Sequence, residues 1–412
     1  MTRQPKSMVP KVRFKGFTDE WEQRKLGELG STFTGLTGKT KEDFGHGDAK
    51  FVTYMNVFQN AVASLEQLDS VEIDPKQNEV KKGDVFFTTS SETPEEVGMS
   101  SVWKYNYDNV YLNSFTFGYR PNIEFDLDYL AAMLRSTTVR KKITLLAQGI
   151  SRYNISKTKM MDIEVPVPSL EEQAKIGAFL SNVEQTITLQ QHKLDQLNTL
   201  KKGLLQKMFA DKKHPQPELR FKGFSGDWEQ HKLENMVHFF NGLTYKPNDI
   251  RKSGTFVIRS SNIQNGTIVS SDDVFVRNEI ANSTNVKIGD IIVVVRNGSR
   301  KLIGKHAIVT VPMNNTVIGA FMTGIRTEHY NFINALLSTL KFKDELRKNM
   351  GATINQITGY MFSNMKFMFP NDQEMDRIGT FLRKLDNLIT LQQKQIDKLN
   401  SLKKSLLQNM FI

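Results

Sequence analysis

The sequence predicts an α+β protein: two β-rich α/β domains separated by two long helices that form an antiparallel coiled coil, arranged as a pseudo-twofold tandem repeat. Three observations predict this fold. Two segments occur twice in the chain, each copy ends in a heptad pattern, and strand-like runs with Gly-Asp turns fill the middles. A length of 412 residues also suits several domains better than one.

Two pairs of segments establish the repeat. Residues 10–26 and 217–233 are identical at 11 of 17 positions, and residues 187–209 and 389–411 at 16 of 23. The offset between the copies is 207 residues at the start and 202 at the end, so the middles have gained and lost residues. The polar, Pro-containing stretch 211–217 has the composition of a linker. Two copies of one scaffold therefore carry two different middles.

The end of each copy predicts a long helix. Eight of ten heptad positions are apolar in each series, which begins at Ile176 in the first copy and at Ile378 in the second. One helix cannot bury such a seam alone, so we expect the two helices to pack antiparallel, as a pseudo-twofold requires. A different chain docked on the seam is the alternative. The predicted seam consists of Ile187, Leu194, Leu197, Leu204, Ile389, Ile396, Leu399 and Leu406, and polar Gln190, Gln392, Lys201 and Lys403 would set its register.

Strand-like segments occupy the same places in both middles. Residues 51–58 and 256–263 are rich in β-branched and aromatic residues, which favours a strand in each copy. The Gly-Asp dipeptides at 83–84 and 289–290 come directly before apolar runs, which is typical of a tight turn that leads into a buried strand.

Polar loops follow these strands in both copies. The loop at 296–305 has Arg, Asn and Ser, which suit base edges and phosphates, and the loop at 90–99 takes its place in the first copy. A solvated surface turn is the alternative for any one residue. Similar loops lie at 34–41 and 241–248 and at 151–155 and 353–357. The candidate DNA-contacting residues are Lys39, Lys41, Tyr54, Asn56, Ser90, Ser91, Arg152, Tyr153, Asn154, Tyr245, Lys246, Arg259, Ser260, Arg296, Asn297, Ser299, Arg300, Lys301, Asn355 and Gln356.

Composition narrows the class of protein. The 55 Lys and Arg exceed the 44 Asp and Glu, and a net charge of +11 favours a polyanionic partner without deciding it. The absence of cysteine excludes disulfides and thiolate zinc sites and fits a reducing cytoplasm. The start of the chain has no apolar signal core, and no run is long enough to cross a membrane. We therefore expect a cytoplasmic protein with no membrane association.

Catalytic motifs are missing from the sequence. There is no Asn/Asp-Pro-Pro-aromatic tetrapeptide for amino methylation, no Gly-rich dinucleotide or adenosylmethionine loop, no phosphate-binding P-loop and no His-Glu-x-x-His. The seven histidines have no metal-ligand spacing. The sequence thus favours a binding protein with no catalytic residue, no metal site and no cofactor of its own.

The repeated motifs resemble the specificity (S) subunit of type I restriction–modification systems. The resemblance rests on Phe-Lys-Gly-Phe at 14–17 with Trp21-Glu22, on its repeat at 221–224 with Trp228-Glu229, and on Leu-Leu-Gln-x-Met-Phe at both helix ends. The segment Val-Pro-Val-Pro-Ser-Leu-Glu-Glu-Gln at 165–173 adds to it, whereas residues 367–374 depart from that pattern. The resemblance covers essentially the whole chain.

The resemblance implies a function and a division of the chain. Residues 1–168 and 211–370 would be target recognition domains, each reading half of a bipartite, asymmetric site in double-stranded DNA. The helices at 169–210 and 371–412 would fix the spacer between the half-sites and dock two modification (M) subunits. Restriction (R) subunits would complete the complex, and these partners would bring S-adenosylmethionine, ATP and magnesium.

Three alternatives remain open at this point. A stand-alone tandem-repeat DNA-binding protein would bind its site without partners. A helical scaffold with β-rich protein-binding domains would show little salt-dependent DNA binding. An enzyme with an unfamiliar active site is the third.

Overall fold

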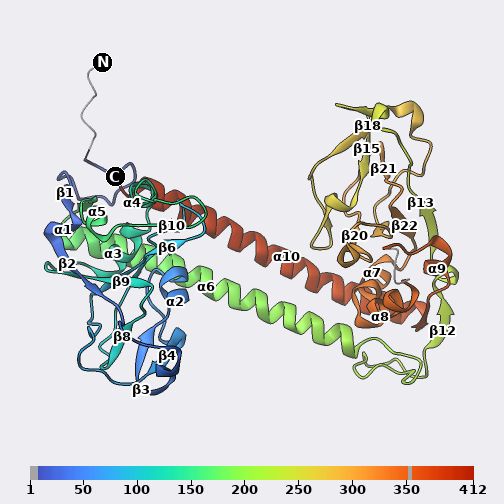
Figure 1. The fold of residues 1–412 in the computed structure, drawn as a ribbon. Coiled ribbons are helices and arrows are strands. Elements are labelled where there is room, and N and C mark those ends of the chain that lie inside the picture. The colour runs from blue at the N-terminus through green and yellow to red at the C-terminus, as the bar shows by residue number, and fades with distance from the viewer. Residues whose placement is uncertain (1–7, 351–354) are drawn as a thin grey trace. The chain divides into compact units, whose positions relative to one another are not determined.

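The computed structural model describes residues 8–350 and 355–412 and contains two compact units. Unit 1 is formed by Met1–Gln191 and Lys394–Ile412, and unit 2 by His192–Gln393. Two long helices, α6 (Leu170–Lys207) and α10 (Asp372–Asn409), are each divided between the units (Figure 1). Each unit therefore combines a β-rich domain with the start of one long helix and the end of the other.

Unit 1 is built on two sheets. An antiparallel sheet has the order β2-β9-β5-β7, with bounds Gly30–Thr34, Thr116–Pro121, Val85–Thr88 and Ser100–Val102. The other has the order β4-β3-β8, with bounds Leu68–Val71, Phe44–Val52 and Val110–Leu112, and its β3-β8 pair is parallel. Two short pairs complete the unit, β1-β11 (Glu22–Lys25, Glu164–Val167) and β6-β10 (Ser90–Ser91, Tyr153–Asn154).

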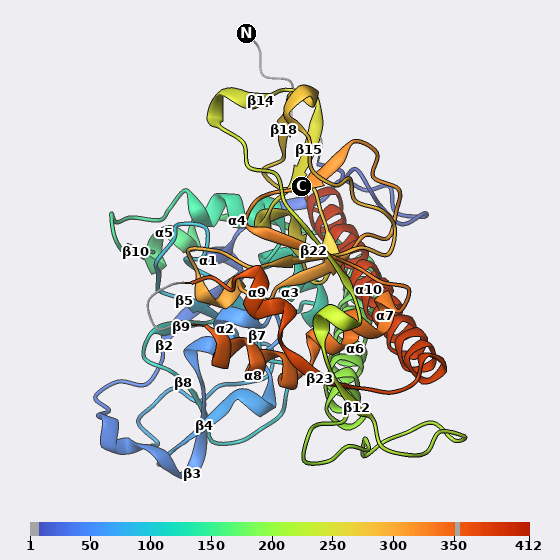
Figure 2. The same cartoon turned by 90° about the vertical axis from the view of Figure 1, so that its right-hand side faces the viewer.

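Short helices cover one end of unit 1. Helices α4 and α5 lie at the opposite end of the unit from β3 and β4 in both views (Figures 1 and 2). The α-helices are α1 (Leu26–Leu29), α2 (Tyr54–Gln59), α3 (Leu127–Leu134), α4 (Thr137–Thr144) and α5 (Lys157–Met161), and the 3-10 turns are η1 (Lys41–Asp43) and η2 (Leu65–Gln67).

Unit 2 repeats this plan. Its antiparallel sheet has the order β13-β22-β19-β20, with bounds His238–Asn241, Met322–Arg326, Ile291–Val294 and His306–Ile308. Its other sheet has the order β14-β18-β15-β21, with bounds Ile250–Arg251, Val274–Val276, Thr255–Ile258 and Thr316–Ile318, and its β15-β21 pair is parallel. The short pairs are β12-β23 (Glu229–Lys232, Lys366–Phe369) and β16-β17 (Ile263–Gln264, Thr267–Ile268).

The helices of unit 2 also gather at one end. Helices α7 and α8 lie away from the sheet of β14, β15 and β18 in both views (Figures 1 and 2). The α-helices are α7 (Tyr330–Ser338), α8 (Leu340–Asn349) and α9 (Gly359–Ser363). The 3-10 turns are η3 (Leu233–Asn235), η4 (Pro247–Asp249), η5 (Ser260–Asn262), η6 (Asn278–Ile280) and η7 (Arg300–Leu302).

The predicted Gly-Asp turns are confirmed. Gly83 and Gly289 adopt φ values of 93° and 90°, a region that favours glycine, and each precedes a strand that is buried along its whole length. The aspartate that follows each glycine accepts two hydrogen bonds from an arginine of the neighbouring strand, Arg120 in unit 1 and Arg326 in unit 2. Both turns therefore belong to the frame that the copies share.

The predicted strands at 51–58 and 256–263 are wrong in their second halves. Strand β3 ends at Val52, because the Thr53 hydroxyl accepts a hydrogen bond from the Asn56 backbone N–H and starts helix α2. Strand β15 likewise ends at Ile258, and the 3-10 turn η5 follows. The chain thus turns sharply away from the sheet at the same point in both units.

The predicted antiparallel pairing of the long helices is confirmed within each unit. In unit 2, Lys201 near the end of α6 pairs at 2.5 Å with Asp386 of the first half of α10. In unit 1, Glu184 of α6 pairs with Lys403 near the end of α10. These are equivalent pairs of the repeat, so both predicted register lysines contact an acid of the opposite helix. All eight predicted seam residues are buried or partly buried.

The repeated Phe-Lys-Gly-Phe motif closes each unit against a long helix. Arg13 donates two hydrogen bonds to the buried Glu172 of α6 at 2.7 and 2.8 Å, and Arg220 binds Glu374 of α10 in the same way. The tryptophan of each motif packs on the phenylalanine at a helix end. Trp21 contacts Phe411 in unit 1, and Trp228 contacts Phe209 in unit 2. Each copy's helix end therefore completes the core of the unit that contains the other copy's domain.

Candidate nucleic-acid interface

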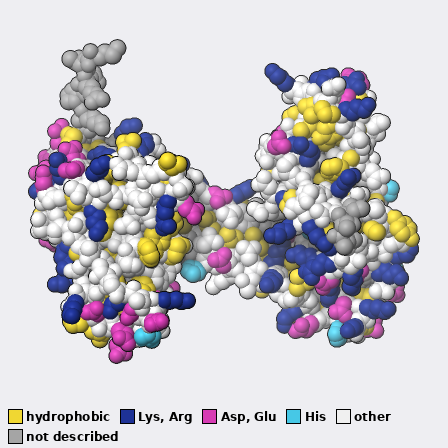
Figure 3. Space-filling model, viewed as in Figure 1, with side chains coloured by type: hydrophobic (Ala, Val, Ile, Leu, Met, Phe, Trp, Pro, Cys, Tyr) yellow, Lys and Arg dark blue, Asp and Glu magenta, His cyan; other side chains and the backbone are white. Residues whose placement is uncertain are grey.

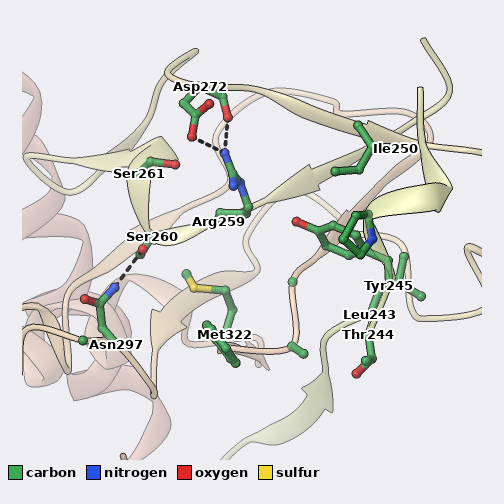
Figure 4. A pocket seen from close by; sticks show the side chains of 15 residues that line it. Leu243, Thr244, Tyr245, Ile250, Arg259, Ser260, Ser261, Asp272, Asn297 and Met322 are labelled. Atoms are coloured by element: carbon green, nitrogen blue, oxygen red, sulfur yellow. Dashed lines mark hydrogen bonds and ion pairs between the residues drawn. The ribbon is translucent and has the colours of Figure 1, made fainter. Parts of the chain in front are cut away.

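A cleft of about 650 Å³ lies in unit 2, where strand ends from both of its main sheets meet (Figure 4). It is lined by the loop after β13, by η5 and by the segments after β19 and β21. Four predicted contact residues come together here: Tyr245, Arg259, Ser260 and Asn297. An aromatic ring, a guanidinium, a hydroxyl and a carboxamide can together provide a stacking surface and hydrogen bonds to base edges.

Polar contacts hold two of these side chains in place. The Asn297 side-chain amide donates to the Ser260 hydroxyl at 3.0 Å (Figure 4). Arg259 forms an ion pair with the exposed Asp272 at 2.5 Å, and its buried Nε has no hydrogen-bond partner in the described part of the chain. Asp272 also lines the cleft, so this ion pair fixes the Arg259 guanidinium within it, and a guanidinium with five N–H donors keeps donors for a ligand.

The loop from Arg296 to Lys305 borders this cleft. Arg296 is exposed, and its guanidinium carbon lies 4.9 Å from the centre of the Phe321 ring. The loop ends at Gly304, where a Cβ would come within 2.3 Å of the Leu346 side chain of α8, and its φ of +83° also requires glycine. The predicted residues Ser299, Arg300 and Lys301 lie exposed on this loop. Figure 3 shows several Lys and Arg side chains close together on one face of unit 2.

Unit 1 has the same backbone but different side chains. The loop from Ser90 to Met99 has a glycine, Gly98, near its end. A Cβ at Gly98 would clash with the Ile143 side chain of α4, just as a Cβ at Gly304 would clash with Leu346. This loop of unit 1 contains three glutamates and no Lys or Arg, whereas the loop of unit 2 contains two Arg, two Lys and no acid. Equivalent loops of the two units therefore carry opposite charge.

Tyr54, Ser90 and Arg152 lie together in unit 1. The Tyr54 hydroxyl donates to the Ser90 carbonyl at 2.7 Å, and burial raises the pKa of Tyr54 while the charge of Arg152 opposes that rise. Arg152 donates to the Ser90 hydroxyl from Nε and Nη2 at 3.3 and 3.2 Å. Ser90 and Ser91 are themselves buried, because β6 pairs with Tyr153 and Asn154 of β10. Arg152 and Asn154 are the exposed members of this group.

The third loop of unit 2 has the same pairing as in unit 1. Arg296 pairs with Gln356 as an antiparallel bridge, and the Asn355 side chain donates to the Gly298 carbonyl at 2.9 Å. Residues 353 and 354 of this predicted loop, with the aligned Gly351, lie outside the described residues.

The structure does not place Asn56 at the predicted interface, because its side chain is buried. Its side chain is fully buried and donates to the carbonyls of Ser64 and Gln67, so its amide stabilises the segment after α2. Asn262 does the same in unit 2, where it is also fully buried. The two asparagines occupy equivalent positions, and both belong to the frame.

The lysines of the first loop pair are apart from the other candidates. Lys39 forms an ion pair with Asp74 at 2.9 Å, which lowers the pKa of Asp74 to about 2. Lys41 is exposed in η1, and the backbone N–H of Lys246 donates to Asp249 at the start of η4. Within residues 8–350 and 355–412, no hydrogen bond or ion pair joins these three side chains to the candidates at the strand ends.

Two exposed aromatic residues were missed by the sequence reasoning. Phe115 and Phe321 occupy equivalent positions after β8 and β21 and are 63% and 53% exposed. Their carbonyls accept the backbone N–H of Thr89 and of Val295 at the ends of β5 and β19. Phe321 lines the cleft. The signal available in the sequence was the recurrence of a phenylalanine after the same strand in both copies.

Comparisons with known proteins identify the family. Residues 18–199 and 225–401 match the type I restriction modification DNA specificity domain, and the chain belongs to this family. It is 20% identical to the type I restriction enzyme MjaIX specificity subunit of Methanocaldococcus jannaschii, over 94% of this chain and 92% of that one. It is 24% identical to the MjaVIII specificity subunit of the same organism over 63% of this chain, a match that spans 64% of that subunit, less than two thirds.

A solved structure supports the fold. The S subunit of a type I restriction-modification system from M. genitalium aligns with a TM-score of 0.66 at 17% identity, covering 98% of this chain and 99% of that chain. No helix among residues 8–350 and 355–412 has the length and apolarity needed to cross a bilayer.

Proposed function

We propose that this chain is the DNA sequence-recognition subunit of a type I restriction–modification complex. Each unit reads one half of a bipartite, asymmetric site in double-stranded DNA, and the chain contributes no catalytic residue. The observation that carries the proposal is the pairing of one frame with two different sets of side chains at the same strand ends. Identical readers would favour a palindrome, whereas different readers suit two different half-sites.

The charge and shape of unit 2 support DNA as the ligand. Its cleft combines aromatic and hydrogen-bonding side chains, and the basic loop beside it suits phosphates. Unit 1 offers Arg152, Asn154 and the exposed Phe115 at the equivalent strand ends. Base contacts of this kind supply specificity, and the lysines and arginines around them supply salt-dependent affinity.

The partners in this proposal are two modification subunits, joined by restriction subunits in the full complex. Exposed leucines recur on both long helices, Leu189 with Leu391 and Leu200 with Leu402. An apolar surface that is present twice suits two copies of one partner. S-adenosylmethionine, ATP and magnesium would be bound by those partners, because a subunit that only recognises DNA has no use for them.

Mapping of methylated adenines tests the proposal. A genome that expresses the chain with its modification subunit should contain a methylated split motif, and deletion of the chain should remove that methylation. Retention of the motif after deletion would contradict the proposal. Tight, sequence-specific binding by the purified chain without any effect on methylation would favour a stand-alone DNA-binding protein instead.

A further inference from the structure

The two units place an arginine side chain at the same strand end from different positions of the chain. Ser90 of unit 1 and Arg296 of unit 2 are equivalent, because Ser90 pairs with Asn154 and Arg296 pairs with Gln356 in matching antiparallel bridges. In unit 2 the guanidinium belongs to this position itself. In unit 1 it comes from Arg152, which reaches the Ser90 hydroxyl from the start of β10.

Each guanidinium group is oriented by a neighbouring side chain, an aromatic ring in unit 2 and a hydroxyl in unit 1. Arg296 lies over the Phe321 ring, with 4.9 Å between the guanidinium carbon and the ring centre. Arg152 is fixed by two hydrogen bonds to one hydroxyl. A supported guanidinium keeps its orientation, which matters more for reading two acceptors of one base than for binding a phosphate.

These two arginines also retain donors for a ligand. Both are exposed, and neither forms an ion pair within the described parts of the chain. Three other arginines of the two domains are committed to the frame. Arg120 and Arg326 bind the aspartates of the Gly-Asp turns, and Arg135 donates to four backbone carbonyls.

The neighbouring side chains favour a base edge over a phosphate. Asn154 lies beside Arg152, and Asn297 lies beside Arg296. Carboxamides suit the adenine edge, and a guanidinium suits the O6 and N7 acceptors of guanine in the major groove. A site built for phosphate alone would need only positive charge, and the acidic loop of unit 1 provides none.

We propose that Arg152 and Arg296 each read one guanine, one in each half of the DNA site. The inference rests on the proposed function and adds the base and the two specificity-determining residues. It also assigns the same task to two residues that are not aligned in the repeat.

Selection from a random duplex library tests the assignment. The probe is a pool of duplexes with two randomised blocks separated by spacers of several lengths, and the protein is the chain in complex with its modification subunits. The wild-type complex should select a split motif with a guanine in each half. Arg296→Ala should lose the guanine preference in one half only, and Arg152→Ala in the other half only.

Two matched measurements separate base reading from charge. Arg296→Lys and Arg152→Lys keep the charge and can still donate to guanine, but they lose the planar two-donor fork, so the guanine preference should be weaker than in the wild type and stronger than in the alanine variants. Replacing the selected guanine by 7-deazaguanine removes the N7 acceptor, and it should weaken wild-type binding about 10-fold but the matching alanine variant hardly at all. Because both side chains are exposed, the thermal unfolding midpoint should not change for the Arg296 variants and should fall only slightly for the Arg152 variants, which lose the hydrogen bonds to Ser90.

The outcomes distinguish this inference from the proposed function. Selection of no split motif by the wild-type complex would overturn both. A split motif that every variant retains, with an affinity loss that is equal for all sequences and rescued by lysine, would make these residues phosphate contacts and would overturn the guanine assignment alone.

Discussion

The loop from Ser90 to Met99 and the loop from Arg296 to Lys305 share their backbone and differ in charge. Each begins at the end of the central strand of its sheet and closes on a left-handed glycine packed against a helix. The first contains three acidic residues and the second four basic ones. A frame fixed by glycines and buried ion pairs therefore leaves the side chains of the loop free to change, and the two units can diverge in ligand without diverging in fold.

The largest expected effect is a loss of stability when the arginine–glutamate pair that both units share is removed. Glu172→Ala leaves Arg13 buried without its carboxylate, so we expect unit 1 to lose about 3–5 kcal/mol of stability. Glu374→Ala should cost unit 2 about 1 kcal/mol less, because Glu172 also accepts from the Trp21 indole at 3.0 Å, whereas the Trp228 indole has no hydrogen-bond partner among the described residues. Hydrogen exchange on peptides of each sheet measures the two units separately. Equal losses in both variants would show that the indole contact does not matter.

Substitutions after the end of one repeat's long helix should destabilise the unit that contains the other repeat's domain. Phe411→Ala removes a ring from the core of unit 1, and Phe209→Ala removes its equivalent from unit 2. We expect about 3 kcal/mol in each case, the lower end for such a change, because neighbours at a helix end can relax. Pulse proteolysis with mass spectrometry identifies the unit that opens. Opening of unit 2 by Phe411→Ala would contradict the observed packing.

The opposite charge of the loops predicts opposite changes in salt dependence. Replacing Arg300 and Lys301 by Gln, which removes two positive charges, should reduce the slope of log K against log salt for duplex binding by about 2. Replacing Glu95 and Glu96 by Lys should steepen it. Lys287→Glu, an exposed change in the Gly-Asp turn, is the control for net charge. The idea fails if the control alters the slope as much as the loop variants do.

The smallest effect concerns Lys39, which lies in the unit 1 loop that corresponds to the unit 2 loop with Tyr245. The ion pair with Lys39 lowers the pKa of Asp74 from 3.8 to about 2. A lowered folded-state pKa stabilises the fold above the unfolded value and loses that contribution as pH falls from about 4 through about 2. Carbon NMR titration should show Asp74 ionising near 2, and Lys39→Met should raise the pKa. An unchanged titration would show that the two side chains are separated in solution.

Periodic features of the fold could be predicted from the sequence. The heptads gave the long helices and their direction, since a seam sustained over many turns has few alternative structures. The Gly-Asp turns were equally readable. The segment at 51–58 was misread because its alternation favours a strand, whereas Thr53 starts a helix there and Asn56 turns inward.

The candidate site was harder to predict because long-range contacts assemble it. Arg152 reaches Ser90 only through the β6-β10 pair, which joins segments 62 residues apart. Tyr245 and Asn297 line one cleft although they lie 52 residues apart in the chain. Phe115 and Phe321 have the residue type of a core position, and only the folded chain shows that they are exposed.

The crossed helix ends have a consequence for synthesis. The core of unit 1 includes Met410 and Phe411, and the Phe411 ring packs on Trp21 and Tyr129. During synthesis the first domain, up to residue 168, is translated before Met410 and Phe411, which follow the whole of unit 2. The core of the first domain therefore stays incompletely packed until the residues after α10 have been made. A chain released early would carry an unfinished first domain, which proteases that sample partly open proteins would remove before it could bind DNA unproductively.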